Sequence, residues 1–89
     1  MVTLRTIVRE KRFEEELAAL EPDLKRADEF LRAVEWALAR DPSAGEQIPQ
    51  TPVHICSMSS IRGNPPNLVV YYTFNDDYVI LLSIKSFKE

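Results

Sequence analysis

Two apolar segments near the C-terminal end constrain the fold more than any other feature of this chain. Residues 68–74 (LVVYYTF) and 78–84 (YVILLSI) are rich in β-branched and aromatic residues, which predicts two strands. Asn75-Asp76-Asp77 lies between them and has the composition of a tight hairpin turn. Both strands are apolar at nearly every position, whereas a sheet with one solvated face alternates apolar and polar residues. A fold that contains this hairpin must therefore cover both of its faces.

Two helical segments precede the hairpin. In residues 11–20, three apolar side chains recur with the spacing of one helix face: Phe13, Leu17 and Leu20. A longer helix should start near Pro22 and end at Asp41-Pro42, because the residue before proline avoids the α region. Its apolar stripe should face the sheet and consists of Leu24, Ala27, Leu31, Val34 and Leu38, widened by Phe30 and Ala37. The short connection between the two segments predicts an antiparallel helical hairpin.

Weaker strand signals complete the pattern. Val2–Val8 predicts a first strand, and the serine-rich segment Val53–Ile61 predicts a weak one. Residues 42–52 contain three prolines and predict an ordered loop, and residues 62–67 predict a turn. The sequence thus predicts one α+β domain over residues 1–89. It should have an N-terminal strand, an antiparallel helical hairpin and then a three-stranded antiparallel sheet.

Two helices can cover only one face of that sheet. The other face is covered either by the C-terminal residues and the long loop, or by a second chain, and we favour the second chain because an exposed apolar sheet face marks an interaction site. Trp36 lies well off the apolar stripe of its helix. We expect it to pack under the following loop, with an exposed anchor for a partner as the alternative.

Charge and cysteine content exclude several classes of protein. The net charge of −3 and the pI near 5.2 have the wrong sign for a protein whose whole surface attracts nucleic acid, although residues 5–12 form a local basic segment. The lone Cys56 excludes an internal disulfide and indicates a reducing compartment, so we expect a cytoplasmic protein. No apolar run has the length of a membrane span, so no contact with a membrane is expected.

Few residue patterns suggest chemistry. His54 and Cys56 lie two residues apart, which places both on one face of a strand, but a lone histidine and an unpaired cysteine in a strand are expected to be structural. Asp76-Asp77 is expected to serve the turn rather than a metal. The chain contains no Cys/His cluster with zinc spacing and no glycine-rich phosphate loop, so neither a metal nor a cofactor is expected.

Three segments together resemble the RelE/ParE superfamily of toxins from bacterial type II toxin–antitoxin modules. They are FEEELAALEPDL (13–24), LRAVEWALARDPSAGEQI (31–48) and VVYYTFNDDYVILLSIK (69–85). In that family a helix likewise ends in an Asp-Pro or Asn-Pro turn with a following glycine, here Asp41, Pro42 and Gly45. The resemblance implies one of two activities, cleavage of messenger RNA on the ribosome by RelE-like members or poisoning of DNA gyrase by ParE-like members. It also implies a small antitoxin protein as partner.

The chain departs from the ribonuclease branch at two places. RelE-like enzymes carry an arginine just before the V-[IV]-Y run, where this sequence has Leu68, and many carry a His or Tyr near the end of the last strand, where Phe87 lies. Cleavage beside a 2′-hydroxyl needs a base, an acid and cations for the phosphorane charge. The nearest substitutes are Arg62, Lys85, Lys88, Tyr71 and His54.

Three hypotheses follow. The first is a toxin-like protein that acts by binding a target such as gyrase or the ribosome, with the RelE-type catalytic residues largely missing. The second is a ribosome-dependent mRNA interferase with a rearranged basic site. The third is a stand-alone domain that dimerises through its apolar sheet face.

Overall fold

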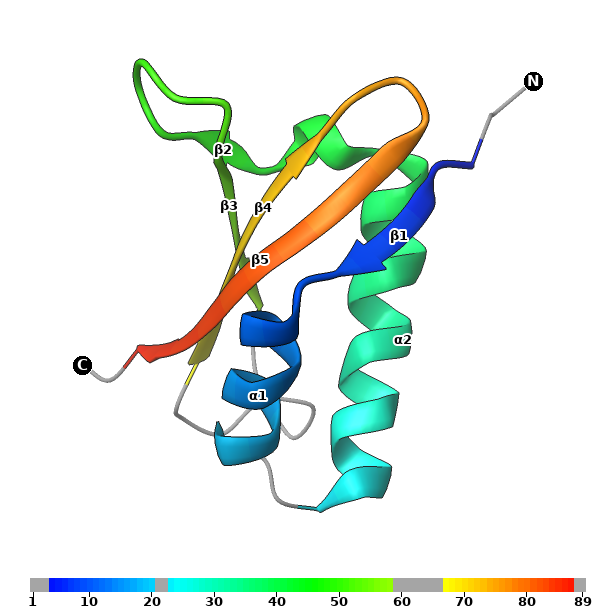
Figure 1. Cartoon of the computed structure of the whole chain (residues 1–89), viewed down its shortest axis with the longest axis vertical. Helices are drawn as coiled ribbons and strands as arrows, with labels where there is room; N and C mark the ends of the chain where they lie inside the picture. Colours follow the sequence, from blue (N-terminus) through cyan, green and yellow to red (C-terminus); the bar gives the residue numbers. More distant parts are fainter. Residues whose placement is uncertain (1–3, 21–22, 59–66, 88–89) are drawn as a thin grey trace.

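The computed structural model describes residues 4–20, 23–58 and 67–87 and confirms the α+β class. Figure 1 shows two helices beside one sheet, with α1 and α2 running in opposite directions. The elements follow in the order β1 (Thr6–Arg9), α1 (Lys11–Leu20), α2 (Leu24–Arg40), a short 3-10 helix η1 (Pro42–Ala44), β2 (Glu46–Gln47), β3 (His54–Met58), β4 (Asn67–Phe74) and β5 (Tyr78–Phe87).

The sheet differs from the prediction. It has five strands in the order β1-β5-β4-β3-β2, and it is mixed, because β1 pairs with β5 in parallel while the other pairs are antiparallel. The prediction of a three-stranded antiparallel sheet was therefore wrong in two respects. The first strand joins the same sheet at the outer edge of β5, and the segment predicted as a loop contributes Glu46 and Gln47 as the edge strand β2. Periodicity shows that a segment is extended but not which strand it pairs with.

The ends of α2 follow from local chemistry. Asp23 is the N-cap, and its Oδ1 accepts hydrogen bonds from the backbone N–H groups of Lys25 and Arg26 at 3.0 and 3.4 Å. The helix therefore begins at Leu24, slightly later than predicted, and Pro22 lies outside the described residues. It ends at Arg40, directly before Asp41-Pro42, as predicted.

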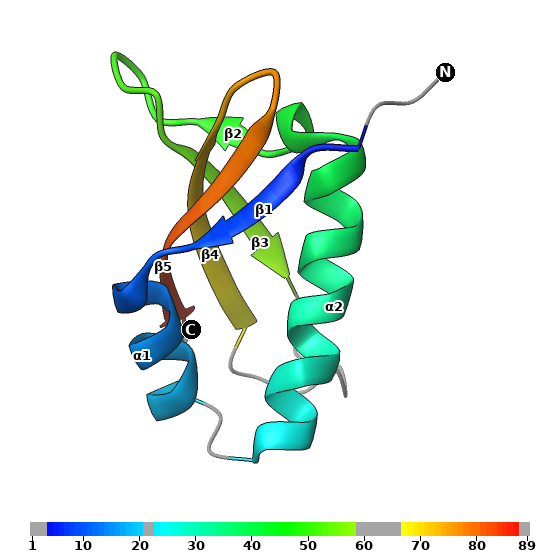
Figure 2. The same ribbon diagram turned by 45° about the vertical axis from the view of Figure 1, so that its right-hand side comes forward.

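The predicted helix faces are largely confirmed. The inner residues of both stripes are buried, but the outermost ones are not, since Leu20 is 38% exposed and Leu24 is 80% exposed. One core cluster joins both helices to β4 and β5, and it consists of Phe13, Leu17, Ala27, Phe30, Leu31, Val34, Leu38, Val70, Tyr72, Val79, Leu81 and Ile84. Figure 2 shows α2 standing along one side of the sheet.

The turn between β4 and β5 has the predicted role. The Asn75 side chain accepts hydrogen bonds from the backbone N–H groups of Asp77 and Tyr78, both at 2.8 Å. The Asn75 N–H in turn donates to the Tyr78 carbonyl at 2.9 Å, which closes the hairpin. This is an Asx-type turn, so Asn75 serves backbone hydrogen bonding here.

The Asp41-Pro42-Gly45 motif packs around a buried tyrosine. Tyr72 is fully buried, and its hydroxyl donates to the Pro42 carbonyl at 2.5 Å and accepts from the Gly45 N–H at 3.2 Å. The backbone at Gly45 has φ −80°, which any residue can adopt. Glycine is required here for steric reasons. A Cβ at this position would lie 2.6 Å from the Ile55 carbonyl oxygen and would also collide with the Tyr72 hydroxyl.

Candidate functional site

The sheet face opposite the core cluster is the first candidate site. The alternation of β4 places Val70 and Tyr72 in the core and turns Val69 and Tyr71 the other way. Strand register extends this second surface across the sheet, since Ile55 pairs with Tyr71 and Val8 pairs with Ile80. We call this surface the open face; its apolar members are Val8, Ile55, Val69, Tyr71 and Ile80.

Except for Ala39, all buried side chains of α1 and α2 belong to the core cluster, which lies on the opposite side of the sheet from the open face. Val8 is 41% exposed, and the other four members are partly exposed. The open face therefore offers a partly exposed apolar surface on the central strands of the sheet.

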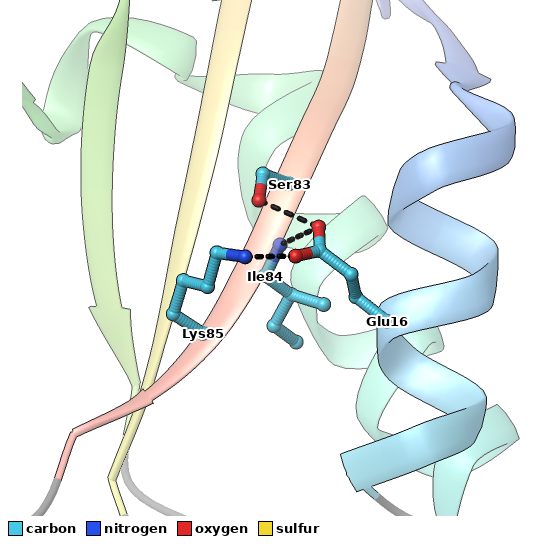
Figure 3. A network of polar contacts seen from close by, with 4 residues as sticks. All are labelled: Glu16, Ser83, Ile84 and Lys85. Atoms are coloured by element: carbon cyan, nitrogen blue, oxygen red, sulfur yellow. Dashed lines mark hydrogen bonds and ion pairs between the residues drawn. The ribbon is translucent and has the colours of Figure 1, made fainter.

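Lys85 and Tyr71, two of the predicted site residues, share the open face. Tyr71 pairs with Ser83 and Val69 pairs with Lys85, so Lys85 lies diagonally across from Tyr71. Cβ atoms in this diagonal relation are about 7–8 Å apart, within reach of long side chains. The Lys85 ammonium, however, forms an ion pair with Glu16 of α1 (Figure 3).

Glu16 binds three successive residues of β5. Its carboxylate accepts from the Ser83 hydroxyl at 2.6 Å and from the Ile84 N–H at 3.4 Å, and it pairs with the Lys85 ammonium. These hydrogen bonds, first from Lys85 and then from Ser83, lower the pKa of Glu16 below its usual range. Glu16 is therefore ionised at neutral pH, and the positive charge of Lys85 is largely compensated.

The position of Glu16 follows from the geometry of the sheet edge. β1 pairs with β5 only as far as Leu81; past that residue β4 continues on one side of β5, and no described strand lies on the other side. The unpaired backbone groups of an edge strand need other partners. Glu16 supplies one of them by accepting the Ile84 N–H, so α1 closes the part of the edge that β1 leaves open.

His54 lies on the other face of the sheet from Tyr71 and Lys85. It pairs with Tyr72 across β3 and β4, and its ring lies 5.7 Å from the Tyr72 ring and 4.8 Å from the Phe74 ring. Its Nδ1 is buried with no hydrogen-bond partner among the described residues. The structure thus places His54 with the core aromatics, apart from Lys85 and Tyr71.

The remaining sequence candidates add no chemistry to the open face. Arg62 and Lys88 lie outside the described residues. Leu68, which stands at the place of the family's strand arginine, packs against the core. Burial raises the pKa of the Cys56 thiol, which disfavours the thiolate that a nucleophile requires. No cluster of three or more metal-ligating side chains occurs in residues 4–20, 23–58 and 67–87.

Two residues of the network, Glu16 and Ser83, were not predicted from the sequence, and the expected position of Trp36 was wrong. Glu16 lies three residues after Phe13, so it borders the buried stripe of α1, and this was the available signal. Nothing in the sequence singled out Ser83. Trp36 is not packed under the loop as expected but is 62% exposed on α2, because it lies on the side of the helix away from the core.

Comparison of the sequence with known proteins identifies no relative. No family model matches the chain, and no curated protein matches it. Within the described residues, neither helix has the length and apolar character that crossing a membrane requires.

The Glu16 network predicts a specific loss of stability in acid. Folding lowers the pKa of this carboxyl group from its ordinary value of 4.5, so the group stabilises the fold at any pH above 4.5. This contribution is lost as the pH falls from 4.5 through the lowered pKa of the folded state. We expect Glu16→Gln to lose about 1 kcal/mol at neutral pH, since an ion pair and charged hydrogen bonds at a partly exposed site become neutral ones. Below pH 4.5, the free energy of unfolding of the variant should also fall less steeply with decreasing pH than that of wild type.

The matched control is Glu15→Gln. Among the residues that the structure describes, Glu15 forms an ion pair with Lys11 alone, at 3.9 Å, and both side chains are largely exposed. Urea unfolding followed by circular dichroism across the acidic range measures all three proteins. Identical acid profiles for Glu16→Gln and wild type would contradict the assigned role of Glu16.

Proposed function

We propose that this chain is the toxin-like component of a bacterial type II toxin–antitoxin module, a divergent member of the RelE/ParE superfamily that acts in the cytoplasm by binding protein. A small antitoxin would occupy the open face, and the target would be a protein assembly such as gyrase or the ribosome. The RelE-type catalytic residues are largely missing. The observation that carries the proposal is the partly exposed apolar surface on the central strands, which no described helix covers.

Two features of the chain support this proposal. The order of elements, a strand, two helices and then the hairpin strands, is the order that the family resemblance implies. The open face also combines apolar residues with Tyr71, a residue type enriched in protein interfaces. A partner segment that packs there would remove this surface from water, which is the main driving force of association.

The rival hypothesis, a ribosome-dependent mRNA interferase, needs cations and an acid or base on one surface. Of its five candidates, Tyr71 and Lys85 share the open face, but the Lys85 charge is compensated by Glu16. His54 belongs to the opposite face. Loss of one well-placed donor to the transition state costs about 10²–10³ in rate, and lysine does not reproduce the bidentate fork of arginine. The geometry therefore supports a binding protein better than a ribonuclease.

Induced expression in a bacterial host tests the proposal. We expect growth arrest while messenger RNA stays intact in primer-extension assays on translating ribosomes. Tyr71→Glu places a charge in the open face without touching the core, so it should abolish neutralisation by the co-expressed antitoxin, the product of a neighbouring reading frame. Thr73→Glu, a second substitution on the same side of β4, should weaken neutralisation less, because it replaces no aromatic contact.

Two outcomes would contradict the proposal. Strong cleavage of translated messages that Lys85→Ala abolishes would establish a ribonuclease with a relocated site. A stable homodimer in light scattering that Tyr71→Glu dissociates, together with no growth arrest, would instead establish a stand-alone dimeric domain.

A further inference from the structure

The outer side of α2 carries an exposed aromatic residue that internal packing does not explain. Trp36 lies two residues after Val34 and two before Leu38, both buried. At 100° per residue, these offsets direct Trp36 away from the core. The side chain is 62% exposed, which is unusual for the residue type with the largest apolar surface. The described residues therefore leave the indole accessible to a partner.

The residues around Trp36 make it a protruding and oriented side chain. Its neighbours three residues away on either side are Ala33, which is exposed, and Ala39, which is buried, so both are small side chains. Its neighbours four residues away are Arg32 and Arg40. We call these five residues the tryptophan knob.

Arg40 holds the indole in place and keeps its own charge available. Its guanidinium lies over the Trp36 ring at 4.0 Å and donates to the Trp36 carbonyl at 3.0 Å. No described carboxylate lies within ion-pair distance of it. Arg32, whose side chain is 80% exposed, is oriented by a 3.0 Å ion pair with Asp28. The knob thus presents an aromatic ring between two ordered arginines, and ordering before binding reduces the entropic cost of association.

We infer that the tryptophan knob is a docking site for a protein partner with an apolar pocket rimmed by acidic side chains. Tryptophan and arginine are the residue types that most often carry binding energy in protein interfaces. The pocket would take the indole, and its acidic rim would pair with Arg40, whose charge no described carboxylate compensates. A helix that inserts one anchor into a groove in this way is a recurrent mode of recognition.

Charge favours an acidic protein over a nucleic acid as the occupant. The net charge of −3 opposes any acidic partner at long range, so the local arrangement of charges around Trp36 decides between the two. Asp28 lies beside Arg32, and the exposed Glu29 lies on the same outer side of α2. A nucleic acid has a charged backbone that would extend along the helix and meet these carboxylates, whereas a compact acidic rim need only reach the Arg40 guanidinium.

The tryptophan knob and the open face lie on opposite sides of the molecule. α2 packs its inner stripe on the core face of the sheet, so its outer side is directed away from the sheet. Occupation of the open face leaves the knob uncovered, and the chain can hold one partner on each side. The inference rests on α2 alone and holds whether or not an antitoxin binds the open face.

Trp36 is the single tryptophan of the chain, so its fluorescence reports directly on the knob. The probe is a synthetic amphipathic peptide with glutamate on its polar face and leucine and phenylalanine on its apolar face. We expect a saturable blue shift of Trp36 emission and protection from acrylamide quenching. The same peptide with lysine in place of glutamate should produce neither effect.

Affinities of the fluorescently labelled peptide for variants of the full chain identify the contributing residues. Trp36→Ala is expected to weaken binding at least tenfold, and Arg40→Ala several-fold. Leu24→Ala, which removes a still more exposed apolar side chain of the same helix, should bind as wild type does, and so should Tyr71→Glu on the open face.

Three results would overturn the inference. Equal responses to the acidic and basic peptides, or no response to either, would leave the knob without the proposed chemistry. A larger shift with duplex DNA that Arg40→Ala removes would assign it to nucleic acid. A blue shift that grows with protein concentration in the absence of peptide would assign it to a second copy of the chain.

Discussion

Phe13→Ala is expected to destabilise the fold more than any other single substitution considered for this chain. Phe13 is fully buried in the core cluster, and truncation of a buried phenylalanine costs about 3–5 kcal/mol. A domain of this size has a total stability of roughly 5–13 kcal/mol, so the loss would be a large fraction of it. We expect the thermal midpoint in circular dichroism to fall by on the order of 20 °C.

The expected loss has a structural consequence beyond the cavity. Phe13 and Leu17 dock α1 on the core, and Glu16 lies between them in the sequence and closes the β5 edge. Weaker docking should therefore raise the amide hydrogen exchange of Ile84. Leu24→Ala is the control, because that side chain is 80% exposed. A Phe13→Ala variant with an unchanged midpoint would mean that α1 does not pack on the core as described.

Gly45→Ala is the second large effect that we expect. An added Cβ would lie 2.6 Å from the Ile55 carbonyl oxygen, which is backbone and cannot rotate away, and it would collide with the Tyr72 hydroxyl. Overpacking of this kind costs about 1–3 kcal/mol. Displacement of Tyr72 would also weaken its hydrogen bonds to Pro42 and Gly45. Denaturant unfolding followed by far-UV circular dichroism measures the loss.

A double-mutant cycle separates the two contacts. Tyr72→Phe removes the hydroxyl, so Gly45→Ala should cost less in that background than in wild type. The loss of stability that persists in the Tyr72→Phe background is due to the clash with the Ile55 carbonyl oxygen. Equal costs in both backgrounds would show that the hydroxyl is not part of the constraint. A stabilising effect of Gly45→Ala would contradict the close packing itself, since φ at this glycine is ordinary and the substitution would then act only on the unfolded chain.

Local signals predicted the elements well where one residue type decides the outcome. Asp41-Pro42 ends α2 because proline restricts the residue before it, and Asn75 closes the hairpin because its side chain accepts two backbone N–H groups. The inner helix stripes were predicted because burial recurs with the helical period. The outer ends of the stripes, Leu20 and Leu24, were predicted to belong to the inward faces but are exposed, since periodicity cannot show where the neighbouring sheet ends.

The candidate site was less predictable. Tyr71 and Lys85 do share one face, but the compensation of Lys85 by Glu16 involves residues 69 positions apart in the chain. His54 and Tyr71 separate to opposite faces because the pairing of β3 with β4 places His54 opposite Tyr72. A sequence shows which side chains could do chemistry, whereas the strand register decides which of them meet.

Hydrophobic period, proline and turn chemistry were sufficient to establish that this chain forms two helices and a hairpin of apolar strands, because those signals act over a few residues. Three features depend on contacts between distant segments: the parallel pairing of β1 with β5, the closure of the β5 edge by Glu16, and the exposure of Trp36. In each, the backbone and side-chain groups had several possible partners. Packing of the whole chain selected one, because only the folded arrangement buries the core and satisfies the sheet edge at the same time.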